Sequence, residues 1–175
     1  VAAKLTLPVD SKPMKAAQAA VGGLTIERDG GRRVVGSKSE RKSLSRCAMY
    51  VSIALTAGGY PDIRPRDPKA YKYHVEGVME RLGFKRIAIN TPWQIGDVAV
   101  MQKGGSLTEA GHMDIWTGEE KGWVSDFYQY NANLGHNPYV YASLSPKNIA
   151  LYRDAQYLNG ATVVTGNSGW DDGNN

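Results

Sequence analysis

The sequence predicts an α+β fold in which N-terminal helices pack on an antiparallel sheet. Up to Gly83, apolar residues recur at helical spacing between Gly and Pro breaks. After Gly83, apolar and polar residues alternate in short runs that Gly, Pro or charged turns separate. Helices followed by a run of strands are typical of the α+β class.

The composition indicates one globular domain. The chain has 175 residues, of which 42% are hydrophobic and 22% charged, enough for one ordinary core. No run approaches the roughly 18 apolar residues of a membrane helix, so no membrane insertion is expected. The N-terminus has no secretory signal pattern. We expect a single domain over residues 1–160 and a flexible tail over residues 161–175, which have the composition of a disordered end.

The net charge and the counts of cysteine and histidine limit which partners and cofactors we expect. The net charge of +4 is a mild excess carried by scattered basic residues, which does not favour nucleic acid as a partner. One cysteine excludes an intramolecular disulfide and Cys-pair metal sites. The three histidines, His74, His112 and His136, lack ligand spacing. No metal or other cofactor is therefore expected.

Three helices are expected, and their ends carry recognisable signals. The first covers residues 10–21, with Asp10 or Ser11 as its cap, and the third covers residues 67–82, capped by Asp67 and ended by Gly83. The second is a mostly apolar central helix capped by Ser43 or Ser45 and ended by Gly58-Gly59. Residues 24–42 are polar and basic, and we expect a loop with one short extended piece.

Five strands are expected in the second half of the chain. They cover residues 85–89, 96–102, 112–118, 123–130 and 148–153. Because aromatic residues on strands usually belong to the core, we assign Trp93, Trp116 and Trp123 to it rather than to a substrate groove. His74 has no acidic or cysteine neighbour at helical spacing, so we expect it to be structural or merely exposed.

Cys47 is a candidate nucleophile. A lone cysteine is usually a small buried hydrophobic residue, but Cys47 lies in the opening turn of the expected central helix. There, unpaired backbone N–H groups and the helix dipole stabilise a thiolate, the reactive form. Arg41, Lys42 and Arg46 add positive charge nearby in sequence. A backbone N–H at the helix start could also face the oxyanion of a tetrahedral intermediate.

His112 is the candidate base. It begins an expected strand after the flexible stretch KGGSLTEAG, and histidine suits a core strand poorly unless its ring nitrogens have partners. Imidazole is a good general base for a thiol. A histidine at a strand start together with a cysteine at a helix start therefore favours a catalytic pair.

Asp126 is the candidate that orients His112. If the strands around it form a hairpin centred near Glu119, positions 112 and 126 face each other, with Cβ atoms about 5 Å apart. Asp126 could then accept the second ring N–H of His112. Asp114 is the alternative, but it lies nearly 7 Å along the same strand, which is long for a direct hydrogen bond. We therefore expect Asp126, although a slip of one residue would turn it to the other face.

These residues resemble a known family. A cysteine at a helix start, Gly-His on a strand and an acid on the next strand are similar to the papain-like NlpC/P60 and CHAP amidases of cell wall. The closer resemblance is to amidase effectors of the type VI secretion system, particularly their fourth class. It rests on CAMYVSIALTAGGYP, NTPWQIGDVAVMQKGG and AGHMDIWTG and covers roughly residues 10–155. Tyr50 stands where the family usually carries arginine.

The resemblance implies a papain-like fold and a cysteine peptidase acting on peptidoglycan. The substrate would be the stem peptide, cut between the γ-carboxyl of D-glutamate and meso-diaminopimelate, with Cys47, His112 and Asp126 catalytic. Such a toxin is secreted without a signal peptide through a contractile secretion apparatus, acts in the periplasm of a target bacterium, and is blocked by a cognate immunity protein. Two alternatives remain open: a phage or bacteriocin-type lysin with the same Cys-His core, and a non-catalytic relative that binds cell wall or a partner protein.

Overall fold

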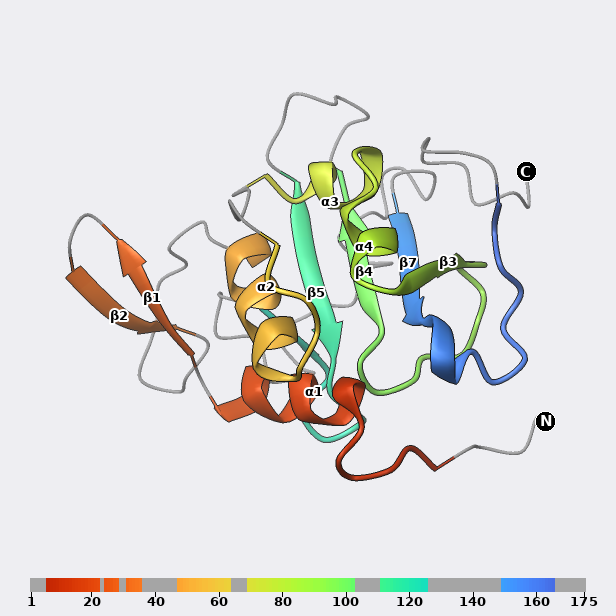
Figure 1. Ribbon diagram of the computed structural model, residues 1–175, viewed down its shortest axis with the longest axis horizontal. Coiled ribbons are helices and arrows are strands. Elements are labelled where there is room, and N and C mark those ends of the chain that lie inside the picture. Colours follow the sequence, from red (N-terminus) through yellow and green to blue (C-terminus); the bar gives the residue numbers. More distant parts are fainter. Residues whose placement is uncertain are drawn as a thin grey trace.

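The structure of the protein, a computed structural model, is an α+β fold. It describes residues 6–22, 24–28, 31–35, 47–63, 69–102, 111–125 and 149–165. Helices α1 (Lys12–Gly22) and α2 (Cys47–Ala57) lie beside each other on one face of a five-stranded antiparallel sheet (Figure 1). The predicted class and the packing of N-terminal helices on an antiparallel sheet are confirmed.

The sheet has the order β3-β7-β4-β5-β6, and every neighbouring pair is antiparallel. Its strands are β3 (Phe84–Ile87), β4 (Val98–Met101), β5 (His112–Trp116), β6 (Trp123–Val124) and β7 (Ile149–Asp154). The last strand in sequence, β7, lies between β3 and β4. Each of the five lies within or beside a segment that the sequence predicts as a strand.

Side chains alternate between two cores, one on each face of the sheet. Beneath α2, Met113 and Ile115 of β5 pack with Val98 and Val100 of β4 and with the buried face of the helix. The other face carries a second cluster, with these buried members: Ile87, Ala99, Met101, Trp116, Trp123, Ile149 and Leu151. Trp93 packs partly buried against that second cluster, so the three tryptophans expected in the core lie in or against it.

The α1–α2 contact fixes the central helix. The hydroxyl of Ser11 accepts a hydrogen bond from the N–H of Met14 (3.4 Å), so Ser11 caps α1. Gly58 directly follows α2, and a Cβ there would lie 2.7 Å from the carbonyl oxygen of Lys12. The two helices therefore approach closely because residue 58 has no side chain.

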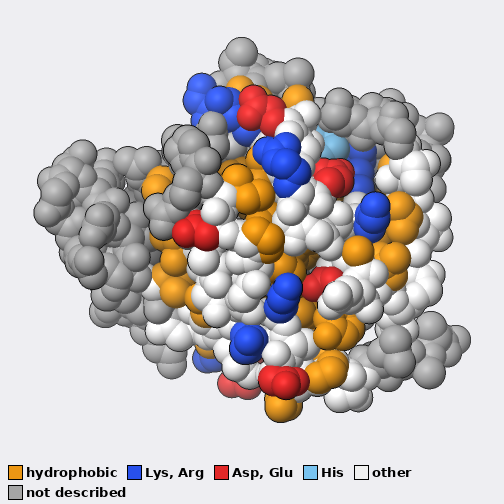
Figure 2. All heavy atoms as spheres, in the orientation of Figure 1, with side chains coloured by type: hydrophobic (Ala, Val, Ile, Leu, Met, Phe, Trp, Pro, Cys, Tyr) orange, Lys and Arg blue, Asp and Glu red, His pale blue; other side chains and the backbone are white. Residues whose placement is uncertain are grey.

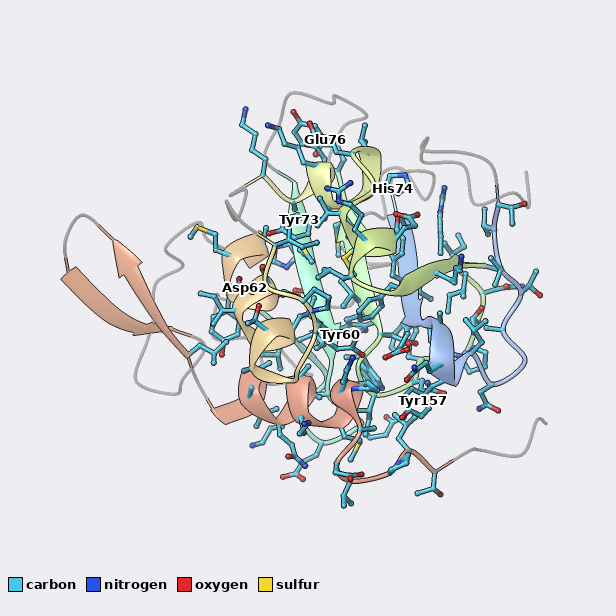
Figure 3. All side chains as sticks on the ribbon, viewed as in Figure 1. Tyr60, Asp62, Tyr73, His74, Glu76 and Tyr157 are labelled. Atoms are coloured by element: carbon cyan, nitrogen blue, oxygen red, sulfur yellow. The ribbon has the colours of Figure 1, made fainter. Side chains whose placement is uncertain are left out.

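Two tyrosines tie α2 to its surroundings. The hydroxyl of Tyr50 donates to the carbonyl of Ala20 at the end of α1. The hydroxyl of Tyr60, which lies just beyond α2 (Figure 3), donates to the carboxylate of Asp154 at the end of β7 (2.6 Å). Both bonds are buried, and together they fix α2 against α1 and the sheet.

The helix predicted over residues 67–82 is interrupted. The chain forms α3 (Tyr71–Val75) and α4 (Val78–Arg81), separated by Gly77 with φ +71°. Glycine adopts this left-handed conformation easily, which ends α3. Gly83 follows α4 with φ +100°, as the end signal predicts. Asp67 and Pro68 lie outside the described residues.

His74 has a structural role, one of the two that the sequence leaves open. Tyr73 and His74 are adjacent on α3, with Tyr73 on the side of α2 and β5 and His74 on the side of β7 (Figure 3). His74 is 2% exposed, and its Nδ1 hydrogen bonds with the hydroxyl of Tyr152 on β7. His74 thus ties α3 to β7, and Tyr73 belongs to the core cluster that packs with α2.

The segment 24–42, expected to be a loop with one short extended piece, instead contains a hairpin. β1 (Leu24–Arg28) pairs antiparallel with β2 (Gly31–Val35), from Leu24 opposite Val35 to Arg28 opposite Gly31. This two-stranded sheet projects beside α2 (Figure 1). The alternation LTIER and the β-branched pair Val34-Val35 were the signal for strands, outweighed in the prediction by the many charged residues.

The chain beyond residue 160 continues along the sheet. The carbonyl of Thr162 accepts from the N–H of Ala88 (3.0 Å), and the N–H of Val164 donates to the carbonyl of Arg86 (2.9 Å). Val163 forms a bridge with Ile87. Residues 161–164, expected to begin the flexible tail, are therefore held against β3, and residues 166–175 lie outside the described part.

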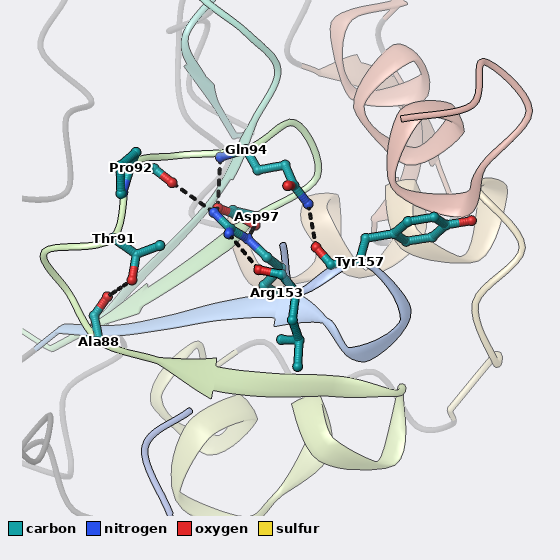
Figure 4. Close-up of polar contacts among 8 residues, drawn as sticks. Ala88, Thr91, Pro92, Gln94, Asp97, Arg153 and Tyr157 are labelled. Carbon is teal, nitrogen blue, oxygen red and sulfur yellow. Dashed lines mark hydrogen bonds and ion pairs between the residues drawn. The ribbon is translucent and has the colours of Figure 1, made fainter. Parts of the chain in front are cut away.

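A buried ion pair holds the turn before β4. Arg153 donates two hydrogen bonds to the carboxylate of Asp97 (2.9 and 2.8 Å) and also binds the carbonyls of Pro92 and Leu158 (Figure 4). The same carboxylate accepts from the backbone N–H of Gln94. One arginine thus joins β7, the turn before β4 and the turn after β7.

The charged side chains that the structure describes are mixed on the face seen in Figure 2, where basic and acidic groups alternate over the helices. Among the described residues, no helix combines the length and the apolar character needed to cross a bilayer.

Candidate active site

Cys47 is the first residue of α2, where the predicted central helix begins. Its side chain faces the core between α2 and the sheet, and 9% of its surface is exposed. The first turn of a helix has N–H groups without intrahelical partners, and the dipole of an 11-residue helix favours a negative group there. The position therefore suits a thiolate. Arg41, Lys42 and Arg46 lie outside the described residues.

His112 is the first residue of β5, opposite Met101 of β4. Gly111 precedes it with φ +73°. The imidazole is largely buried, with 11% of the side chain exposed. The ring is thus held by the sheet with a small opening to solvent.

The sulfur of Cys47 lies close enough to the imidazole of His112 to raise the pKa of the ring, through a hydrogen bond and through its charge. The Nε2–H of His112 donates a hydrogen bond to Oδ1 of Asp114 (2.6 Å). Nδ1 is therefore the ring nitrogen left to face the sulfur. The two residues that the sequence pairs, one from a helix start and one from a strand start, are brought together.

Asp114 is the acid that forms a hydrogen bond with the ring of His112, whereas the sequence favoured Asp126. Side chains two residues apart share a face of the strand and lean along it, and the length of the imidazole spans the distance between the two Cβ atoms. The expectation that nearly 7 Å is too long was wrong because it compared backbone spacing with a bond between side-chain ends. Asp114 is 1% exposed.

The hairpin between β5 and β6 has a register one residue away from the expected one. Ile115 lies opposite Val124 and Trp116 opposite Trp123, whereas a turn centred on Glu119 would put Ile115 opposite Trp123. The expected register is therefore wrong. Because side chains alternate between the two faces of a sheet, a shift of the register by one residue turns each side chain of β6 to the face opposite the expected one.

This register removes the reason for placing Asp126 opposite His112. Asp126 itself lies outside the described residues. Ser125, just before it, is buried, and its hydroxyl donates to the carbonyl of Met113 on β5 (2.8 Å). Of the three predicted site residues, the structure brings Cys47 and His112 together and adds Asp114.

The electrostatics of the site favour a charged imidazole. Burial alone lowers the pKa of His112, but the charge of Asp114 and its hydrogen bond, followed by the contact with Cys47, raise that pKa well above its ordinary value of 6.5. At neutral pH the arrangement therefore holds an imidazolium between a carboxylate and a sulfur. Such a neighbour stabilises a thiolate.

No group of three or more His, Cys, Asp or Glu side chains is placed to hold a metal ion within the described ranges. The chemistry that the described site can support is nucleophilic attack by sulfur with proton transfer through imidazole. No known family model matches this sequence, and no curated protein is detectably similar to it.

Proposed function

We propose that this protein is a cysteine hydrolase of the papain-like NlpC/P60 type that cuts the peptide part of bacterial cell wall. The observation that carries the proposal is the contact of Cys47 with His112, whose other ring nitrogen binds Asp114. A nucleophile, a base and an orienting acid in hydrogen-bonding contact are the parts that acyl transfer needs. The elements that carry them, a helix start and a strand start, are also those of the resembling family.

In the proposed reaction, the thiolate of Cys47 attacks the carbonyl carbon of a peptide bond. Backbone N–H groups in the first turn of α2 stabilise the oxyanion. The C–N bond breaks as His112 gives its proton to the leaving amine, and a thioester remains on Cys47. His112 then takes a proton from water, the hydroxide attacks the thioester, and the C–S bond breaks to release the acid. Asp114 keeps the imidazole ring oriented throughout.

The substrate and the biological setting follow from the resemblance. The proposed bond joins the γ-carboxyl of D-glutamate to meso-diaminopimelate in the stem peptide. The proposed setting is a type VI secretion effector, an antibacterial toxin that acts in the periplasm of a target cell and is held in check by an immunity protein. A phage or bacteriocin-type lysin would use the same chemistry and differ only in delivery.

Digestion of purified peptidoglycan that contains meso-diaminopimelate tests the proposal. The wild type should release fragments whose masses show cleavage within the stem peptide. Cys47→Ala and His112→Ala should each lose roughly a thousandfold or more of the rate while keeping the circular dichroism spectrum of the wild type. His74→Gln is a matched control, because it changes another buried histidine. Equal release by Cys47→Ala and the wild type would end the proposal.

The low exposure of Cys47, 9% of its surface, favours a second candidate: a non-catalytic relative that binds cell wall. Iodoacetamide distinguishes the two. A catalytic thiolate should alkylate quickly near neutral pH, whereas a sealed thiol should react only after unfolding. Binding to peptidoglycan without either alkylation or cleavage would support this second candidate.

A further inference from the structure

We propose that Gly111 is a positioning residue for the Cys47–His112 pair, acting through its contact with the end of β4. The inference rests on the proposed function, since it concerns how the base of that site is held. Gly111 directly precedes His112, and its φ of +73° lies in the left-handed region that residues with side chains rarely adopt.

The space around Gly111 is closed by the neighbouring strand. A Cβ at this position would lie 2.4 Å from the carbonyl oxygen of Met101 and 2.7 Å from Oε1 of Gln102. Met101 is the last residue of β4, and Gln102 follows it with 0% of its surface exposed. Any side chain at position 111 must therefore displace backbone, which packed surroundings resist.

The displaced backbone belongs to the residue that pairs with His112. Met101 lies opposite His112 in the β4–β5 ladder, so a shift of its carbonyl changes the position at which β5 begins. The ring of His112 contacts both Cys47 and Asp114. A movement of about 1 Å at a catalytic group is enough to impair its chemistry. Gly111 thus acts on the site through His112 without touching substrate.

Gly83 and Gly118 also have a positive φ but are not enclosed in this way. Gly83 has φ +100°, but a Cβ there would meet nothing within 4 Å. It lies between α4 and β3 and serves as a control for Gly111→Ala, because an alanine there also has a positive φ but no close neighbour. Gly118, just after β5, faces only the flexible side chain of Ile95 at 3.6 Å.

The test measures the rate of Cys47 alkylation by iodoacetamide as a function of pH. We expect Gly111→Ala to lose about tenfold of the rate near pH 6, as His112→Ala does, because less thiolate is present without an imidazolium in contact. Gly83→Ala should keep the profile of the wild type. A lower melting temperature in both glycine variants with an unchanged alkylation profile in Gly111→Ala would overturn the positioning role.

Two further variants separate a failure of the positioning role from a failure of the proposed function. If His112→Ala and the wild type alkylate alike, the Cys47–His112 pair does not exist, and both the proposed function and the positioning role fail. If Gly111→Ala does not fold, Gln102→Ala decides, since the side chain of Gln102 closes the space beside Gly111, with Oε1 2.7 Å from where a Cβ would lie. Its alkylation rate near pH 6 should fall between those of the wild type and His112→Ala, and a rate equal to the wild type would overturn the proposal.

Discussion

The ring of His112 donates its Nε2–H to Oδ1 of Asp114 at 2.6 Å, although only Met113 separates the two residues on β5. An acid on the same strand therefore holds the ring of His112. Because both residues belong to one strand, the geometry of the pair depends on the strand itself rather than on the register of a hairpin. The pair is buried, with 11% and 1% of the two side chains exposed.

Asp114→Asn should lower the pKa of His112 and slow peptide cleavage while preserving the fold. The amide keeps the shape of the carboxylate but loses its charge, and that charge is the largest cause that raises this pKa. We expect a loss of roughly a hundredfold or more in kcat, as for other orienting acids. If a folded Asp114→Asn protein cleaves at the wild-type rate, Asp114 is not the residue that orients His112.

The pH dependence of stability should report the same pair. The folded-state pKa of His112 is raised above its ordinary 6.5, so the stabilisation is fully present below about pH 6.5 and is lost as pH rises through the folded pKa. Urea unfolding from pH 6 to pH 9 should therefore show a falling free energy of unfolding in the wild type. Asp114→Asn should show a smaller fall, and equal slopes would contradict the assignment.

Local signals determine most of the fold. The Ser11 cap, Gly58-Gly59 and Gly83 mark helix ends that the structure confirms, and the alternating runs after Gly83 became strands. The break at Gly77 was missed because one glycine within a helical pattern is often tolerated, and its left-handed conformation depends on tertiary packing. The hairpin at residues 24–35 was missed because charged residues concealed a period of two.

The site was predictable as far as residue type and position define it. A cysteine at a helix start and a histidine at a strand start carry chemical signals that do not depend on register, and the structure brings Cys47 and His112 together. The orienting acid depended on a hairpin register, which sequence does not define to one residue. Asp114 lies on the same face of the strand as His112 because side chains alternate. An imidazole is long enough to span the distance between them along the strand, and this length favoured Asp114.

Breaking the buried ion pair between Arg153 and Asp97 should strongly destabilise the fold. Burial raises the pKa of the Asp97 carboxyl, and Arg153 opposes that rise. Arg153→Met leaves the carboxylate buried without its partner, which costs about 3–5 kcal/mol near neutral pH. The loss should be smaller at pH 5, where the carboxyl takes up a proton more readily. Urea unfolding at both pH values checks this, and an equal loss at both would contradict it.

Gly58→Ala should separate α1 from α2 and destabilise the fold. Its Cβ would lie 2.7 Å from the carbonyl oxygen of Lys12 and 2.8 Å from Cβ of Ala16, so we expect a loss of about 1–3 kcal/mol in thermal or urea unfolding. Gly22→Ala is the matched control, because a Cβ there meets nothing within 4 Å. Equal stabilities of the two variants would show that the helices do not pack as described.

The coupling of Cys47 to His112 is tested most directly by an NMR titration of the His112 ring nitrogens in the wild type and in Cys47→Ala. The wild-type ring should remain an imidazolium well above pH 6.5, and the pKa of His112 should fall when the sulfur is removed, since Cys47 contributes to raising it. An identical His112 titration in the two proteins would mean that sulfur and imidazole do not interact, and would contradict the account.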